Sequence, residues 1–182
     1  MFSFNFLNQI VLIALFSFFC HPVFSASAEE IDIKVDAALD RFKEEVDGAE
    51  RFLGRANGVL VFPEVIKAGF GIGGEYGEGA LRISGSSVDY YNTASASIGF
   101  QLGAQMKTII LVFLNADALE DFRNSSNWEA GVDGSVALVE FGAGKDLTTT
   151  SFDEPIVGFV INNKGLMYNL TLEGTKITKI NK

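Results

Sequence analysis

The chain has 182 residues, of which 48% are hydrophobic and 17 are phenylalanine, so it can bury a core and does not have the composition of a disordered chain. Its formal net charge at pH 7 is −9, which excludes long-range attraction to nucleic acid or to anionic membranes. We therefore expect no nucleic-acid partner, and any membrane binding has to be local or apolar.

The first 28 residues have the pattern of a signal peptide. Residues 10–19 form an apolar stretch that is short for a membrane span, and Ala26, Ser27 and Ala28 offer a small-residue cleavage site. We expect export to the periplasm, which leaves residues 29–182 as a single domain. An uncleaved anchor is the alternative.

Cleavage at this site would remove Cys20 and His21, the one cysteine and the one histidine of the chain. The exported domain would then have no disulfide, no cysteine or histidine nucleophile, and no histidine or cysteine ligand for zinc or haem. We therefore expect a non-catalytic protein without a metal or another cofactor, stabilised by core packing alone.

An amphipathic helix is predicted over residues 30–53. Its polar face carries more acid than base, which favours packing on its own domain over binding to a membrane. Gly54 follows as a stop signal. The apolar residues recur at helical spacing, and they are Ile31, Val35, Leu39, Phe42, Val46 and Ala49.

From Gly58 onward the pattern changes to β-structure. A turn at residues 77–79 separates the second predicted strand from the third. The last strand of this series is apolar throughout, which is typical of a strand that is covered on both faces. The predicted strands are residues 58–62, 67–76, 80–84, 88–91, 94–104 and 108–114.

The second half of the chain continues this alternation. Asn115 is predicted to cap a short helix that ends near Phe122, with a polar loop at residues 123–127. Residues 128–141 form a long strand or a bent pair broken near residues 131–134, and residues 146–153 form a loop. The last strands are residues 156–161, 166–172 and 175–180, with a turn at 162–165 between the first two.

Mostly local antiparallel pairing, with one long helix and one short helix, predicts an α+β fold. We expect a mainly antiparallel, curled sheet or a partly closed β-barrel, with the N-terminal amphipathic helix packed against it. The strongest reason for the curl is a run of glycines. Six of them fall within eleven residues: Gly69, Gly71, Gly73, Gly74, Gly77 and Gly79.

Glycine weakens a strand, so a chain tolerates it where another backbone approaches closely or where a sheet bends sharply. Residues 69–74 also satisfy the G-x-G-x-x-G pattern of dinucleotide-binding proteins. The residues that follow, Glu75 to Gly79, are a poor helix start and place acid where phosphate would lie. A structural role for these glycines is therefore favoured over nucleotide binding.

The glycine-rich segment resembles the SYLF domain, a lipid-binding family. The family pattern A-x-G-V-x-x-F-P appears from Ala56 to Pro63, and K-A-G-F-x-x-G-G-x-Y-G-x-G appears from Lys67 to Gly79. Three later blocks agree, namely SIGFQLGAQ, WEAGVDGSVAL and KGLMYNLTLEG. The segment SSVDYYNTAS departs from the Trp-Ser-x-Pro-like segment that many relatives carry before the second block.

The resemblance implies binding of a phospholipid or another amphiphile. Lys67 could meet a phosphate or carboxylate headgroup with backbone N–H groups as extra donors, or it could be a strand-end lysine that faces water. Actin bundling, known for some relatives, is not expected of an exported chain. The candidate lipid-binding residues are Lys67, Gly69, Phe70, Gly73, Gly74, Tyr76 and Gly77.

We therefore expect a non-catalytic lipid-binding protein of the bacterial cell envelope, associated with a membrane surface. One alternative is a structural or assembly protein that binds an envelope protein partner. A lesser alternative is a hydrolase that uses two facing carboxylates as acid and base. The candidates for that pair are Glu64, Glu75, Glu78, Asp89, Asp133 and Glu140.

Overall fold

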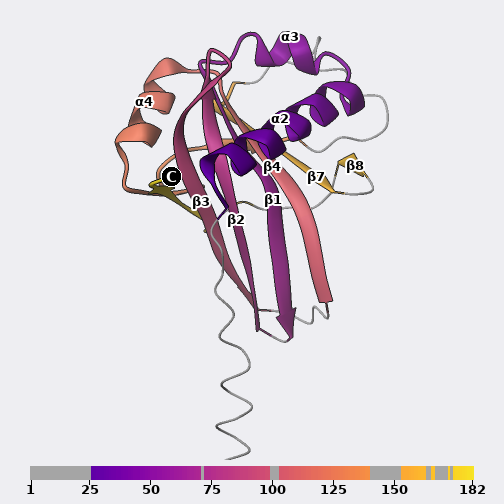
Figure 1. The fold of residues 1–182 in the computed structure, drawn as a ribbon. Helices are drawn as coiled ribbons and strands as arrows, with labels where there is room; N and C mark the ends of the chain where they lie inside the picture. Colours follow the sequence, from indigo (N-terminus) through magenta and orange to yellow (C-terminus); the bar gives the residue numbers. More distant parts are fainter. Residues whose placement is uncertain are drawn as a thin grey trace, which may run out of the picture.

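The computed structural model describes residues 26–70, 72–98, 103–139, 153–162, 165–166, 172 and 174–182. The predicted signal peptide lies outside these residues, except for its last three. Within them, nine strands form one curled sheet, and helices lie across and beside it (Figure 1). The elements are α2 (Ala28–Glu45), α3 (Ala49–Leu53), β1 (Gly58–Phe70), β2 (Ile72–Ile83), β3 (Ser86–Ile98), β4 (Gly103–Phe113), α4 (Ala116–Asn124), β5 (Asn127–Glu129), β6 (Val136–Leu138), β7 (Ile156–Asn162), β8 (Gly165–Leu166) and β9 (Lys176–Ile180).

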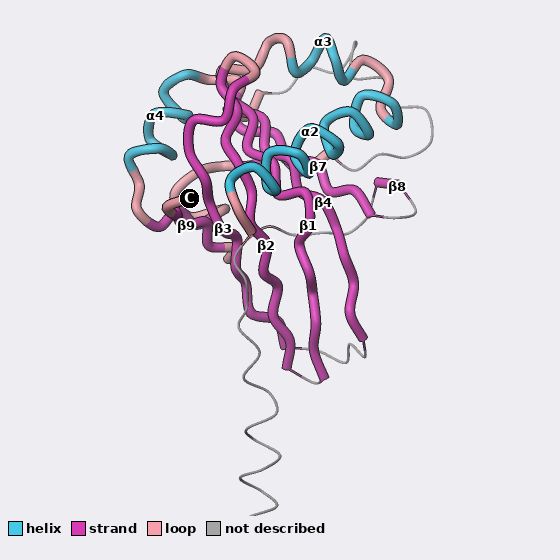
Figure 2. The backbone as a smooth tube through the Cα atoms, viewed as in Figure 1, coloured by secondary structure: helices cyan, strands magenta, loops and turns pink. Residues whose placement is uncertain are grey.

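The sheet has the strand order β5-β9-β3-β2-β1-β4-β7-β6, with β8 paired to β7. All pairs between named strands are antiparallel except the parallel pair of β6 and β7. The two end strands of this order, β5 and β6, follow each other in the chain, and an Ala130–Gly134 bridge links their connection. The sheet therefore curls into a partly closed structure (Figure 2), and the predicted α+β fold is confirmed.

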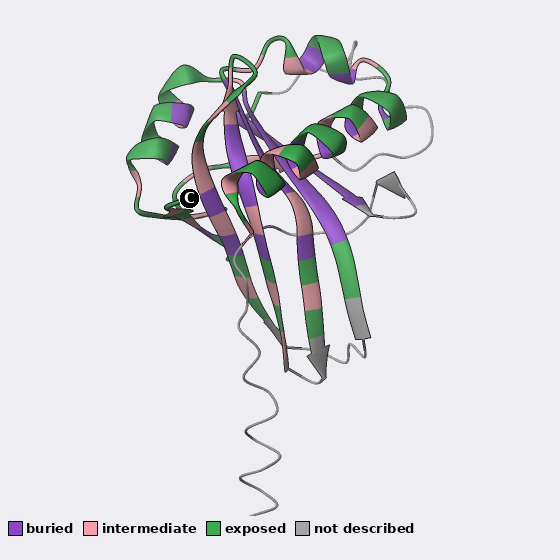
Figure 3. Ribbon diagram, in the orientation of Figure 1, coloured by how far each residue is buried: buried purple, intermediate pink, exposed green. Residues whose placement is uncertain are grey.

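The first core lies between the sheet and the N-terminal helices. Val61 of β1, Val112 of β4 and Phe159 of β7 point to α2 and α3 and are buried. The ring of Phe159 lies 4.7 Å from that of Phe42 and 5.7 Å from that of Phe52, measured between centroids. The predicted docking of the N-terminal helix on the sheet is therefore confirmed (Figure 3).

The second core fills the opposite, concave face of the same strands. Leu60, Leu111 and Phe113 alternate with the residues of the first core and pack with α4 and β5. Phe122 of α4 lies 5.0 Å from Phe113 and 5.5 Å from Trp128 between ring centroids. Because β4 is buried on both faces, its central residues are apolar throughout, as the sequence predicted.

The single helix predicted over residues 30–53 is wrong in one respect, because the structure divides it into α2 and α3. Gly48 adopts a left-handed backbone conformation, with φ of 81°, immediately before α3. A residue in that conformation ends the helical hydrogen-bond pattern, and glycine adopts it without steric cost. The Ser27 hydroxyl caps the start of α2 by accepting a hydrogen bond from the Glu30 amide at 3.1 Å.

The predicted strand boundaries between residues 58 and 104 are also wrong. The predicted strand 67–76 covers the ends of two strands, β1 and β2, which pair with each other through residues 59–70 and 72–82. The turn expected at residues 77–79 lies inside β2 instead. Likewise, the predicted strand 94–104 contains the end of β3 and the start of β4.

Gly77 and Gly79 are required by a bulge in β1 rather than by a turn. Pro63 has no amide hydrogen, and β1 carries one extra residue around it relative to both neighbours, β2 and β4. A Cβ at Gly79 would lie 2.1 Å from the carbonyl oxygen of Val61, and one at Gly77 would lie 2.7 Å from that of Glu64. The close backbone approach that the sequence suggested is therefore confirmed at these two positions.

Other predicted elements agree with the structure more closely. Asn115 caps α4 by accepting a hydrogen bond from the Ala118 amide at 3.0 Å, and the helix runs two residues beyond Phe122. The predicted break near residues 131–134 separates β5 from β6. Most of the predicted loop 146–153 and most of the strand 166–172 lie outside the described residues.

Replacing Gly79 by alanine should destabilise the protein by at least about 2 kcal/mol, because the new methyl group meets the backbone of β1. Gly74→Ala in the same strand is the matched control. There the nearest atom, the carbonyl oxygen of Ser95, is at an ordinary 3.5 Å, so the change should stay within about 0.5 kcal/mol. Urea unfolding followed by circular dichroism would measure the change in unfolding free energy for both variants. Equal changes would contradict the close contact between Gly79 and the backbone of Val61.

Candidate functional site

The strands β1 to β4 continue past α2 as a four-stranded arm (Figure 1). We call the side that carries α2 the outer face and the side that carries α4 the inner face. Directly opposed residues of antiparallel strands share a face, so the register assigns each described side chain to one of them. The arm comprises residues 64–70 of β1, 72–78 of β2, 92–98 of β3 and 103–107 of β4.

Beyond Glu64 and Glu78, the described outer face of the arm is apolar and exposed. Met106, Ile66, Tyr76 and Ala94 stand opposite one another on four successive strands. The first three are 47%, 49% and 49% exposed, which is high for large apolar side chains. The next row towards the end of the arm holds only small residues, Ala68, Gly74 and Ala96, all of them exposed.

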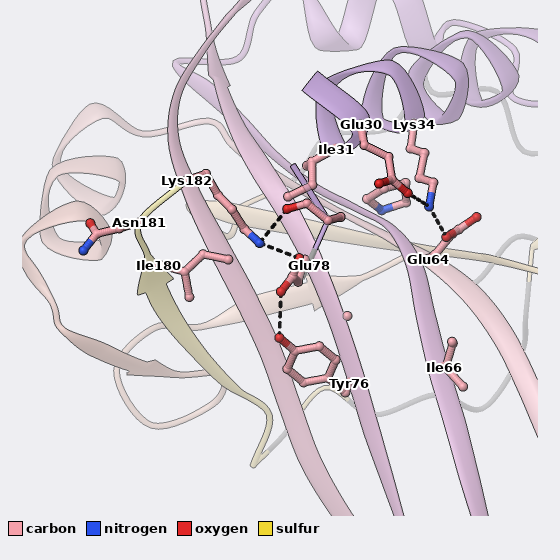
Figure 4. Close-up of a pocket in the computed structure, with 13 residues that line it drawn as sticks. Glu30, Ile31, Lys34, Glu64, Ile66, Tyr76, Glu78, Ile180, Asn181 and Lys182 are labelled. Carbon is pink, nitrogen blue, oxygen red and sulfur yellow. Dashed lines mark hydrogen bonds and ion pairs between the residues drawn. The ribbon is translucent and has the colours of Figure 1, made fainter. Parts of the chain in front are cut away.

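A cavity of about 540 Å³ adjoins this apolar row where the arm meets the start of α2 (Figure 4). Ile66 and Tyr76 contribute to its apolar wall, together with Ile31 from α2. Ala26, Pro63, Gly77 and Ile180 also line the cavity, and the rest of the lining is polar or charged and comes from distant parts of the chain. These residues include Glu30, Lys34, Glu64, Glu78, Asn181 and Lys182.

Each lysine at the cavity is paired with carboxylates. The Lys34 ammonium lies 2.9 Å from both Glu30 and Glu64. The hydrogen bond to Glu64, and then that to Glu30, raises the pKa of Lys34, so it stays charged. On the other side, the Lys182 ammonium donates to Glu78 at 2.8 Å and to the carbonyl oxygen of Ala26 at 2.8 Å.

Lys34, Glu64, Glu78 and Lys182 form what we call the charged rim of the cavity. Tyr76 joins the apolar row to this charged rim. Its hydroxyl donates a hydrogen bond to the Glu78 carboxylate at 2.9 Å, as Figure 4 shows. Burial of part of the ring, followed by the hydrogen bond to Glu78, raises the pKa of the Tyr76 hydroxyl, which therefore stays neutral. A side chain with an apolar ring and a polar tip fits a boundary between water and an apolar phase.

The inner face of the arm has the opposite character. Glu75 lies between two lysines, 3.2 Å from Lys67 and 2.5 Å from Lys107, and Lys107 is only 8% exposed. Burial of Glu75 opposes its ionisation, but the hydrogen bonds and charges of Lys107 and then Lys67 outweigh burial and lower the pKa of the carboxyl. These charges tie β1, β2 and β4 together.

The structure separates the predicted lipid-binding residues. Lys67 and Gly77 lie at inner-face positions, where Lys67 is held by Glu75 and Gly77 packs against β1. Gly74 and Tyr76 lie on the outer face. Gly69 pairs with Gly73, and Phe70 pairs with Ile72, in the backbone register.

Sequence reasoning missed the residues that make the outer face distinctive. Ile66 and Met106 were not singled out, and the contribution of Lys34 and Lys182 to one cavity depends on contacts between distant parts of the chain. The local sequence gives no period-two signal there, because Val65 and Ile66 are both apolar. The bulge at Pro63 decides which of the two lies on the outer face.

The candidate acid–base carboxylates are distributed over several places. Glu64 and Glu78 are opposed in the register and both line the cavity, but each is ion-paired with a lysine. Asp89 is paired with Arg123 and Lys179, and Asp133 accepts a hydrogen bond from the Glu129 amide. Glu75 lies on the inner face, and Glu140 lies outside the described residues.

No helix among the described residues is long and apolar enough to cross a membrane. In the same part of the chain, no group of three or more acidic, histidine or cysteine side chains is placed to hold a metal ion.

Residues 94–182 match the Ysc84 family, which is described as Las17-binding protein actin regulator. This match confirms the predicted resemblance to the SYLF domain over the second half of the chain. The match includes the three later blocks on which the resemblance partly rested, and the two glycine-rich blocks precede it. Among curated proteins, no match to the chain was found. Within the SYLF match lie the end of β3, all of β4 and α4, and the strand β9 that leads to Lys182.

Replacing Glu75 by glutamine should destabilise the protein by about 1–3 kcal/mol at pH 7, because it leaves Lys107 buried without its counter-charge. The pKa of Glu75 is lowered in the folded state, so its stabilisation is present above the ordinary value of 4.5 and is lost as pH falls through the folded-state value.

The difference in unfolding free energy between the wild type and Glu75→Gln should therefore shrink as pH falls below about 4.5. Urea titrations at pH 7 and pH 3 would measure this difference. Asp40→Asn, which removes an exposed helix ion pair with Lys43, is the control and should change stability little at either pH. A difference that grows at low pH would contradict the ion-pair assignment.

Proposed function

We propose that this protein is a non-catalytic lipid-binding protein of the bacterial cell envelope, exported to the periplasm and associated with the membrane surface. The observation that carries the proposal is the exposed apolar row Met106–Ile66–Tyr76–Ala94, with an amphiphilic cavity beside it. Soluble proteins seldom expose several large apolar side chains side by side unless a ligand, partner or membrane covers them.

The cavity beside the row suits part of an amphiphilic molecule. Its volume of about 540 Å³ lies in the usual range of ligand sites, roughly 300–1,000 Å³. An acyl chain or another apolar part would lie over Ile66 and the ring of Tyr76, and a polar headgroup would meet the charged rim formed by Lys34 and Lys182. Both lysines already have carboxylate partners. A headgroup phosphate would therefore replace a carboxylate as the partner of a lysine, and it would add no new attraction.

A protein-binding role in envelope assembly is the second candidate. Residues 95–98 of β3 and 103–106 of β4 each pair with one neighbouring strand in the described part of the chain, which leaves two strand edges open. An extended segment of another protein can add to such an edge. The description of the matched family as Las17-binding also supports a general binding role.

A carboxylate-based hydrolase is less supported. A general acid has to hold a proton near neutral pH, and an ion pair with lysine opposes this. Glu64 and Glu78, the two candidate carboxylates at the cavity, both have lysine partners. We therefore propose a role in binding rather than in catalysis.

Co-sedimentation with vesicles tests the proposal. The protein would be isolated as cells process it, its N terminus determined by mass spectrometry, and mixed with phosphatidylcholine vesicles with or without phosphatidylglycerol. We expect it to sediment with the vesicles, and its affinity to change by less than about tenfold between low and high salt, because few phosphates are neutralised.

The absence of association with any vesicle composition would contradict lipid binding. Strong binding that salt abolishes would contradict the apolar mode, since an electrostatic mode loses affinity steeply with salt. Cross-linking to one envelope protein, without lipid association, would instead favour the second candidate.

A further inference from the structure

We infer that the outer face of the arm is the surface through which this protein lies on a lipid bilayer, with its two described rows at the boundary between headgroups and acyl chains. The inference rests on the proposed function and adds the binding surface and the orientation of the molecule. It depends on how side chains are divided between the two faces of the arm.

The described outer-face positions beyond the charged rim are free of charged side chains. They form the row of Met106, Ile66, Tyr76 and Ala94 and the row of Ala68, Gly74 and Ala96. Two residues along a strand span about 7 Å, so the two rows form one uncharged surface that extends over at least this length of the arm.

The inner face at the same level is polar. Lys67 and Glu75 form an ion pair there, and Ser95 and Gln105 stand opposite these two residues in the register. Insertion of the arm along its length would bring these groups into the apolar phase, which is costly. A bilayer that contacts the outer face alone leaves them in water.

The rim beside the rows fits the headgroups of such a membrane. The carboxylates of Glu64 and Glu78 lie one row closer to α2 than Ile66 and Tyr76, and their lysine partners add positive charge. The hydroxyl of Tyr76 reaches this rim while its ring extends the apolar row. Tyrosine is enriched where an apolar layer meets water.

A bilayer accounts for this surface better than a folded protein partner does. Protein interfaces centre on large anchors that fill matching pockets, whereas the second row presents only alanine and glycine across three strands. The net charge of −9 opposes a second copy of the same chain, and a membrane surface without strong negative charge is free of that repulsion.

Two cysteine variants on neighbouring positions of β3 test the orientation. Ala96→Cys places a probe on the outer face, and Ser95→Cys places it on the inner face of the same strand. Each would be made in the full chain with Cys20→Ser, labelled with an environment-sensitive dye, and mixed with phosphatidylcholine vesicles that carry bromine on their acyl chains. We expect a blue shift and quenching at position 96 and neither at position 95.

Equal responses at both positions, or a response at position 95 alone, would overturn this inference even if the protein sediments with vesicles. That result would leave the proposed lipid binding intact and place it on another surface. A concentration-dependent blue shift at position 96 without lipid would also overturn it, because a second copy would then cover the face. Failure to sediment at all would overturn the proposed function and this inference together.

A second pair of variants tests how much the apolar row contributes to membrane binding. Ile66→Gln/Met106→Gln removes two large side chains from the row, and it should weaken binding to phosphatidylcholine vesicles about tenfold or more. Val88→Gln/Val132→Gln is the matched control, because both valines are exposed, at 42% and 72%, but lie outside the arm. Equal loss of binding in the two variants would overturn the assignment of the surface.

Discussion

The bulge that surrounds Pro63 determines the chemistry of the arm. Side chains alternate between the two faces of a strand, so one extra residue reverses the assignment of every residue that follows. Before the bulge, Val61 points to the helices and Phe62 to the concave core. After it, Val65 points to the concave core, which places Ile66 on the outer face and Lys67 on the inner face.

The neighbouring strands are shaped to accept this bulge. On one side, Gly77 and Gly79 have no side chain where the backbone of β1 comes close. On the other side, the Thr108 hydroxyl donates a hydrogen bond to the Pro63 carbonyl oxygen at 2.8 Å. The glycines of β2 therefore serve the register of β1, and through it they produce an arm with one apolar and one charged face.

Patterns within short stretches of sequence predicted much of the fold. The errors concern features that depend on contacts between distant parts of the chain. The α+β class, the cap at Asn115 and the double-sided burial of β4 follow from spacing and composition within short windows. The strand ends were misplaced because glycine marks both turns and close backbone contacts, and one sequence does not distinguish them. The faces of the arm were not predicted, since they depend on the pairing of β1 with two other strands.

The start of α2 lies within the predicted processing site. The Ser27 hydroxyl caps this helix, and the Ala26 carbonyl oxygen accepts a hydrogen bond from Lys182 at the other terminus of the chain. A peptidase that cuts after Ala28 would remove both groups and leave a new ammonium group at the positive end of the helix dipole, where it is unfavourable. A cut before Ala26 would keep both interactions, so the position of any such cleavage would set how firmly the first turn of α2 and Lys182 are held together.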